Sequence, residues 1–136
     1  MYTMLSTAHA HGFAPGDELD RVLYEHFRGE WKKRMKLDTE GDGKARWKLI
    51  LEAESVKKTL SASASANVSV ESLMEGLDFK SSINRVRFDM LARKVYQRVA
   101  EFALEAVKKA TLEPIDIDEV HPRNYPLNTP ILLYLC

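Results

Sequence analysis

The chain has 136 residues, of which 45% are hydrophobic and 29% charged, and its formal net charge is zero. This length and composition fit one folded domain with a modest core and exclude a disordered chain. Zero net charge gives no electrostatic reason to expect direct binding to nucleic acid or to an anionic membrane. The one cysteine, Cys136, excludes an internal disulfide. Because residues 1–11 lack the basic start and apolar run of a signal peptide, we expect a cytoplasmic protein.

The first half of the chain predicts one strand and two helices. Alternation over residues 2–8 indicates a short strand, and a turn with Pro15 and Gly16 follows it. Acidic residues then open a helix that reaches about Met35, with an apolar stripe at Leu19, Val22, Leu23, Phe27 and Trp31. A second helix is expected over residues 44–60, with its stripe at Leu49, Ala53, Val56 and Leu60. We expect Trp31 and Trp47 to be packing residues.

The second half predicts a hairpin and a long helix. Residues 67–71 and 77–80 are expected to pair around a turn at Glu75 and Gly76. A helix then runs from a cap at Asn84 to about residue 110, and residues 115–120 form a last strand. The predicted class is α+β, helix-rich, with a small antiparallel hairpin and an incomplete sheet. Exposed strand edges in such a fold favour self-association.

One face of the second predicted helix carries a polar ridge, defined by Glu54, Lys57, Lys58 and Ser61. At 100° per residue these side chains lie together, away from the apolar stripe. An acid and two bases at spacings of three and four form favourable helical pairs, so the ridge is typical of a solvated face. The alternative is a recognition surface, and periodicity alone favours the solvated face.

The ridge lies within five motifs that resemble the nucleotide-binding domain of the seventy-kilodalton heat-shock chaperones (DnaK type), which has an actin-like ATPase fold. The motifs occupy residues 16–20, 54–61, 72–79, 83–88 and 117–120, in the order found in that family. The resemblance implies that residues 1–120 form most of the second lobe of that domain, mainly its small helical subdomain. Residues 121–136 are then a divergent tail.

The same resemblance implies an ATP or ADP site. It places Glu54, Lys57, Lys58 and Ser61 against the adenine and ribose, and Gly16 near the phosphates. A carboxylate can accept hydrogen bonds from ribose hydroxyls, and lysine stems can pack on a purine ring. No residue pattern here indicates a catalytic set or a metal site, since His9 and His11 have no third ligand nearby.

Several family features are absent. Pro15 stands where the family has the first of two glycines, and Tyr125 and Pro126 stand near the expected position of a later pair. The first lobe, with its phosphate loop and catalytic residues, has no counterpart in this sequence. We therefore expect weak or no nucleotide binding by the chain alone, and no ATPase activity.

Within the family, residues 69–73, 83–85 and 112–120 are most similar to the atypical fungal member that pairs with a J-protein in the ribosome-associated complex. This implies ATP binding in support of co-translational protein folding, with a J-protein, the ribosome and a nucleotide-exchange factor as partners. The alternatives are a non-nucleotide docking module for a J-protein or exchange factor, and a degenerate product without function. A basic cluster near the end of the first helix (Arg28, Lys32, Lys33, Arg34 and Lys36) could contact RNA or favour the helix dipole, and we prefer the dipole.

Overall fold

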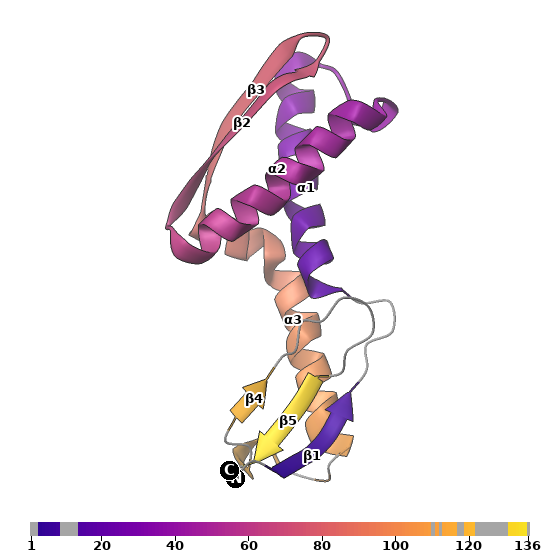
Figure 1. Cartoon of the computed structure of the whole chain (residues 1–136), viewed down its shortest axis with the longest axis vertical. Helices are drawn as coiled ribbons and strands as arrows, with labels where there is room; N and C mark the ends of the chain where they lie inside the picture. The colour runs from indigo at the N-terminus through magenta and orange to yellow at the C-terminus, as the bar shows by residue number, and fades with distance from the viewer. Residues whose placement is uncertain are drawn as a thin grey trace. The chain divides into compact units, whose positions relative to one another are not determined.

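The computed structural model describes residues 3–8, 14–109, 111, 113–116, 119–121 and 131–135. These residues belong to two compact units (Figure 1). One unit is Gly16–Arg93, and the other combines Met1–Pro15 with Lys94–Cys136. Helix α3 (Arg85–Lys109) supplies residues to both units. The α+β class predicted from the sequence is confirmed.

The Gly16–Arg93 unit contains the helix that carries the ridge and the elements that pack around it. Helix α1 (Pro15–Met35) is followed by a short 3-10 helix η1 (Thr39–Gly41) and by α2 (Gly43–Ala62). Strands β2 (Ser65–Met74) and β3 (Leu77–Asn84) then form the antiparallel hairpin. The predicted helices and the hairpin are confirmed, with both strands longer than expected.

Side-chain caps fix where α2 and α3 begin. The Oδ1 atom of Asp42 accepts hydrogen bonds from the backbone N–H groups of Lys44 (2.9 Å) and Ala45 (3.3 Å). The Oδ1 atom of Asn84 accepts from the N–H of Arg87 at 2.7 Å, as the sequence predicted. Each cap satisfies amide groups that the first helical turn leaves without a partner.

The hairpin turns at Glu75 and Gly76, both of which have positive φ (52° and 76°). Two such residues between paired strands are typical of the tight turn that matches strand twist, and glycine adopts this conformation without strain. The ladder runs from Ser65 opposite Asn84 to Val70 opposite Phe79 and resumes at Met74 opposite Leu77. Ser72, with φ 43°, lies in the irregular stretch between these two parts.

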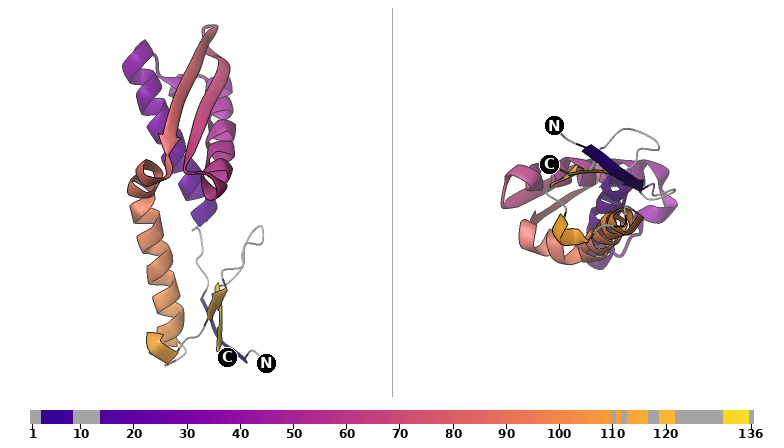
Figure 2. Two further views of the ribbon diagram at one scale, coloured as in Figure 1. Left: turned by 90° about the vertical axis from the view of Figure 1, so that its left-hand side faces the viewer. Right: turned by 90° about the horizontal axis from the view of Figure 1, so that it is seen from below.

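The core lies between one face of the hairpin and the two helices (Figure 2). On β2, Ala66, Val68 and Val70 are buried while the residues between them are exposed, as expected for a half-buried strand. The predicted stripe of α2 is buried throughout, and α1 buries Leu23, Tyr24, Phe27 and Trp31. The rings of Phe27 and Trp31 approach Phe79 edge-on, with centroids 6.2 and 5.9 Å away.

The other unit contains a three-stranded antiparallel sheet with the order β1–β5–β4. Strand β1 (Thr3–Ala8) pairs with β5 (Ile131–Leu135), with Thr3 opposite Leu135 and Ala8 opposite Ile131. Strand β5 also pairs with β4 (Glu119–His121). The first strand therefore finds its partner at the other end of the chain. A 3-10 helix η2 (Pro114–Asp116) replaces the first part of the strand predicted for residues 115–120.

Two apolar side chains that the sequence predicts to be buried are exposed. Trp47 is 61% exposed, so its assignment as a packing residue is wrong. It lies opposite the stripe of α2, because Ala45 and Leu49 on either side of it face the core. The apolar spacing of the long helix also predicts burial of Tyr96 alongside Ala92 and Val95, but Tyr96 is exposed.

We predict that Phe79→Ala lowers the free energy of unfolding by about 3–5 kcal/mol, because its ring is 1% exposed and packs against the rings of Phe27 and Trp31. Urea denaturation followed by circular dichroism measures this change. The matched control is Leu77→Ala on the same strand, where the side chain is largely exposed and the cost is expected to stay below about 1 kcal/mol. Equal losses for both variants would contradict the packing described here.

Candidate functional site

The ridge on α2 divides into two groups of contacts. Lys57 turns toward α1, whereas Glu54 and Lys58 pair with each other along α2. The division arises because Val56 and Leu60 hold one side of α2 in the core, which leaves Lys57 at the edge of the helix interface. Lys58 and Ser61 are exposed, and Glu54 and Lys57 are half-buried.

Lys57 is held by two groups at the start of α1. Its Nζ donates to Oδ2 of Asp20 at 2.7 Å and to the backbone oxygen of Gly16 at 3.2 Å. The Lys57 side chain is 25% exposed and that of Asp20 is 17% exposed, so the ion pair is shielded from water more than a surface pair. An ammonium group has three N–H donors, and these contacts use two of them.

Gly16 therefore lies beside Lys57 of the ridge. A Cβ at this position would lie 3.8 Å from Nζ of Lys57, which is ordinary contact. Pro15 is the first residue of α1, where its fixed φ and missing N–H are compatible with the helix.

Glu54 and Lys58 form an ion pair at 2.8 Å, four residues apart on α2. The hydrogen bond from Lys58 lowers the pKa of Glu54, and the same bond raises the pKa of Lys58. The hydroxyl of Ser61 donates to the backbone oxygen of Lys58 at 2.6 Å. The favourable pair predicted for this face is confirmed for Glu54 with Lys58, while the contact of Lys57 is with α1.

Asp20 is the residue that the sequence-based site omitted. Its Oδ2 binds Lys57, and its Oδ1 is buried without a hydrogen-bond partner in the described structure. Asp20 and Lys57 are 37 residues apart, so helical spacing could not connect them. The feature of the sequence that could have identified Asp20 was its position at the end of the first family motif, residues 16–20.

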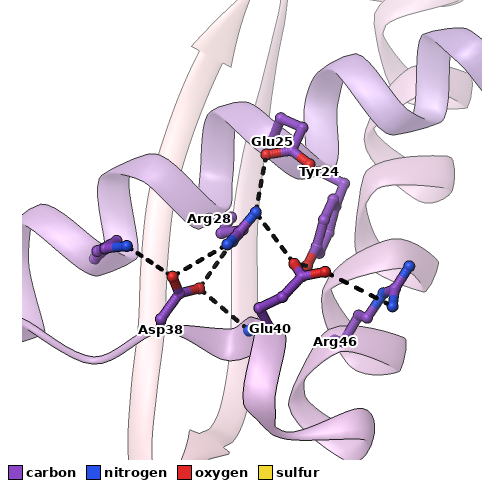
Figure 3. A network of polar contacts seen from close by, with 7 residues as sticks. Tyr24, Glu25, Arg28, Asp38, Glu40 and Arg46 are labelled. Atoms are coloured by element: carbon purple, nitrogen blue, oxygen red, sulfur yellow. Dashed lines mark hydrogen bonds and ion pairs between the residues drawn. The ribbon is translucent and has the colours of Figure 1, made fainter.

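The basic cluster at the end of α1 is engaged largely within the protein (Figure 3). Arg28 binds both carboxylate oxygens of Asp38, at 2.8 and 3.1 Å, and also approaches Glu25 and Glu40. Lys32 donates to the same Asp38 carboxylate at 2.7 Å. These hydrogen bonds, those from Arg28 first, hold the pKa of Asp38 far below its ordinary value. The network favours a structural role for the cluster.

A groove of about 420 Å³ lies between α1 and α3, away from the ridge. It is lined by two apolar side chains (Val22 and Leu91), three charged ones (Glu18, Arg21 and Glu25) and His26. Burial lowers the pKa of His26. None of the predicted site residues lines this groove.

Two further findings on the described residues concern membrane crossing and metal binding. No described helix is long and apolar enough to cross a bilayer. Within the described part of the chain, no three His, Cys, Asp or Glu side chains gather as metal ligands would. His9 and His11 lie outside the described residues.

A sequence model described as "Hsp70 protein" matches residues 1–121. The chain belongs to the Hsp70 family. It is 38% identical to the ribosome-associated complex subunit SSZ1 of Saccharomyces cerevisiae over 120 residues, which cover 88% of this chain and 22% of SSZ1. It is 37% identical to a heat shock protein 70 homologue of Schizosaccharomyces pombe over 135 residues, 99% of this chain and 24% of that protein.

Another Hsp70 relative is the ribosome-associated molecular chaperone SSB of Candida glabrata, 38% identical over 120 residues (88% of this chain and 19% of that chaperone). The chain thus spans about a fifth to a quarter of the length of these curated relatives. Its α+β fold of helices and a hairpin is consistent with part of an Hsp70 ATPase domain. The family predicted from the motifs is confirmed.

We predict that Asp20→Ala lowers the free energy of unfolding by about 1–3 kcal/mol, because it leaves the shielded Lys57 ammonium without its carboxylate. Asp17→Ala is the matched control, since it removes an exposed acid from the same helical turn and is expected to cost less. Urea denaturation compares the two variants. The contact is structurally unimportant if Asp17→Ala costs as much as Asp20→Ala.

The Asp38 network predicts a loss of stability in acid. A carboxyl whose pKa is lower in the folded than in the unfolded state stabilises the fold above the unfolded pKa, near about 4. That contribution is lost as the pH falls below this value and Asp38 becomes protonated. Thermal denaturation between neutral pH and strong acid should show Asp38→Asn less stable than the parent at neutral pH, with the difference shrinking below about pH 4. Parallel pH profiles would refute this role of Asp38.

Proposed function

We propose that this chain forms the nucleoside-facing part of an Hsp70-type nucleotide site, and that it binds ATP or ADP weakly when alone. The observation that carries the proposal is the placement of Lys57. Asp20 and Gly16 hold its ammonium group at the edge of α2, with one N–H donor left for a ligand hydroxyl. Because the contacts are preformed, a ligand would not have to order this long side chain.

The other ridge residues supply complementary groups. The Glu54 carboxylate can accept from ribose hydroxyls, and its pair with Lys58 keeps it ionised. The stem of Lys58 is exposed and can pack on a purine ring. Ser61 is exposed near the end of α2, where its hydroxyl can accept a hydrogen bond while donating to the backbone. We assign no catalytic residue and expect no ATP hydrolysis by the chain alone.

The relatives give this site a cellular context. SSZ1 and the SSB chaperone are both named as ribosome-associated proteins, and SSB as a molecular chaperone. We therefore propose that the chain acts in the cytoplasm in support of protein folding at the ribosome. A J-protein and a nucleotide-exchange factor are the proposed protein partners.

Titration calorimetry with ATP and ADP tests the nucleotide site. We expect weaker than micromolar affinity, and a further loss of at least several-fold for the double variant E54A/K57A. The control K44A/E71A also removes one base and one acid, both exposed and outside the ridge. Micromolar binding by the parent, or equal affinities for the two variants, would contradict the proposed site.

A second candidate function is a docking module for a J-protein or an exchange factor. It is favoured by Trp47 and Leu51, which lie one turn apart on α2 and are 61% and 49% exposed. Exposed aromatic side chains are frequent anchors at protein interfaces.

The two functions can be separated with two double variants. If the chain is a docking module, W47A/L51A should lose binding to the J-protein or exchange factor by at least tenfold, measured by biolayer interferometry, while E54A/K57A retains it. Loss of partner binding in E54A/K57A alone would contradict the docking assignment to Trp47 and Leu51.

A further inference from the structure

The β2–β3 hairpin is a two-stranded sheet, so each strand has one edge that no other strand of the described residues covers. Such edges present backbone N–H and C=O groups that can pair with a strand of another molecule. In the regular part of the ladder on β2, the outward groups belong to every second residue, including Ser69, and the irregular stretch that follows contains Glu71 and Ser72. On β3, the residue opposite Ser69 is Lys80, whose backbone groups also point outward.

Two side chains of α2 occupy the outer edge of β2. The carboxylate of Glu52 accepts a hydrogen bond from the N–H of Ser69 at 3.2 Å. The Nζ of Lys48 donates to the backbone oxygens of Glu71 and Ser72, at 2.9 and 2.7 Å. Lys48 and Glu52 are one helical turn apart, so one face of α2 places both beside the strand.

On β3, the side chain of Arg34 from α1 binds the outward backbone, and Glu30 lies beside it on the hydroxyl of Ser81. Arg34 donates from Nη1 to the backbone oxygen of Lys80 at 2.7 Å. Glu30 accepts from the hydroxyl of Ser81 and also approaches Arg34 at 3.7 Å. Each helix thus presents an acid and a base four residues apart, and the base binds backbone oxygen in both cases.

We propose that Lys48 and Glu52 on α2, and Arg34 and Glu30 on α1, are edge guards that prevent the hairpin from pairing with a second copy of this chain. Glu52, Lys48 and Arg34 fill backbone hydrogen-bonding positions that an added strand would need, and Glu30 supports Arg34 through their ion pair. A second strand could pair with β2 only after breaking three hydrogen bonds to charged groups, which are stronger than neutral hydrogen bonds.

If the guards were removed, the β2 strand of a second copy of this chain could pair with the exposed edge of β2. Antiparallel pairing of two β2 strands about Ser69 would place Asn67 of one copy opposite Glu71 of the other. No like charges would then face each other on the exposed side of the sheet. The zero net charge of the chain also gives little long-range repulsion between copies.

The test compares the oligomeric state of K48A/E52A with that of E54A/K58A, by size-exclusion chromatography with light scattering over a wide range of concentrations. Both variants remove one acid and one base, four residues apart, from α2. The contacts of Glu54 and Lys58 lie along α2, so their loss leaves the hairpin edge guarded. We expect K48A/E52A to approach the mass of a dimer with increasing concentration, while the parent and E54A/K58A remain monomeric.

A folded K48A/E52A that stays monomeric would overturn the proposal, as would equal association of the parent or of E54A/K58A. Single variants at Glu52 provide a readout that does not require dimers. In the monomer at low concentration, Glu52→Leu should speed amide hydrogen exchange at Ser69 by up to about tenfold, the equivalent of one lost hydrogen bond. Glu52→Gln keeps the acceptor and should retain slow exchange. Equal exchange at Ser69 in both variants would also overturn the proposal.

Discussion

Burial of one face of the β2–β3 hairpin against α1 and α2 is the constraint on which the other features of this unit depend. Phe79 supplies the contact to the aromatic rings of α1, and Val68 and Val70 extend the same face along β2. Because these contacts fix the two helices beside the strands, they also fix which polar side chains can meet. The Lys57–Asp20 ion pair joins the two helices, and the Lys48 and Glu52 contacts join α2 to β2. The polar contacts are thus consequences of the apolar packing.

The same arrangement gives the ridge on α2 two different chemical environments. Lys57 lies where α2 meets α1 and is shielded and positioned by Asp20. Lys58, one residue further, is exposed and pairs with Glu54 on its own helix. A surface with one fixed and one exposed lysine suits a ligand that has both directed hydroxyl groups and an apolar ring. These are the features of a nucleoside, which is why the proposed function rests on Lys57 rather than on the whole charge pattern.

Local patterns in the sequence predicted the helices, the hairpin and the buried stripes of α1 and α2, because amphipathic spacing and caps such as Asn84 act within a few residues. The pairing of β1 with β5 could not be predicted, since these strands lie at opposite ends of the chain and neither carries a pairing signal. The ridge residues were identified through their motifs, and the Glu54–Lys58 pair through its helical spacing, but the contact of Lys57 with α1 was not predicted. Asp20 meets Lys57 only after the helices pack, and the same holds for Lys48 at the edge of β2. Trp47 was misplaced because its size favoured burial, while its position on α2 dictated exposure.

The central claim is that Lys57 and its neighbours face the nucleoside, and nuclear Overhauser contacts between ATP and the isotope-labelled chain test it most directly. The account predicts contacts from the ribose and adenine protons to the side chains of Lys57 and Lys58, with no contacts to Val22 or Leu91 in the groove between α1 and α3. Contacts confined to that groove, or to residues outside the ridge, would contradict the claim.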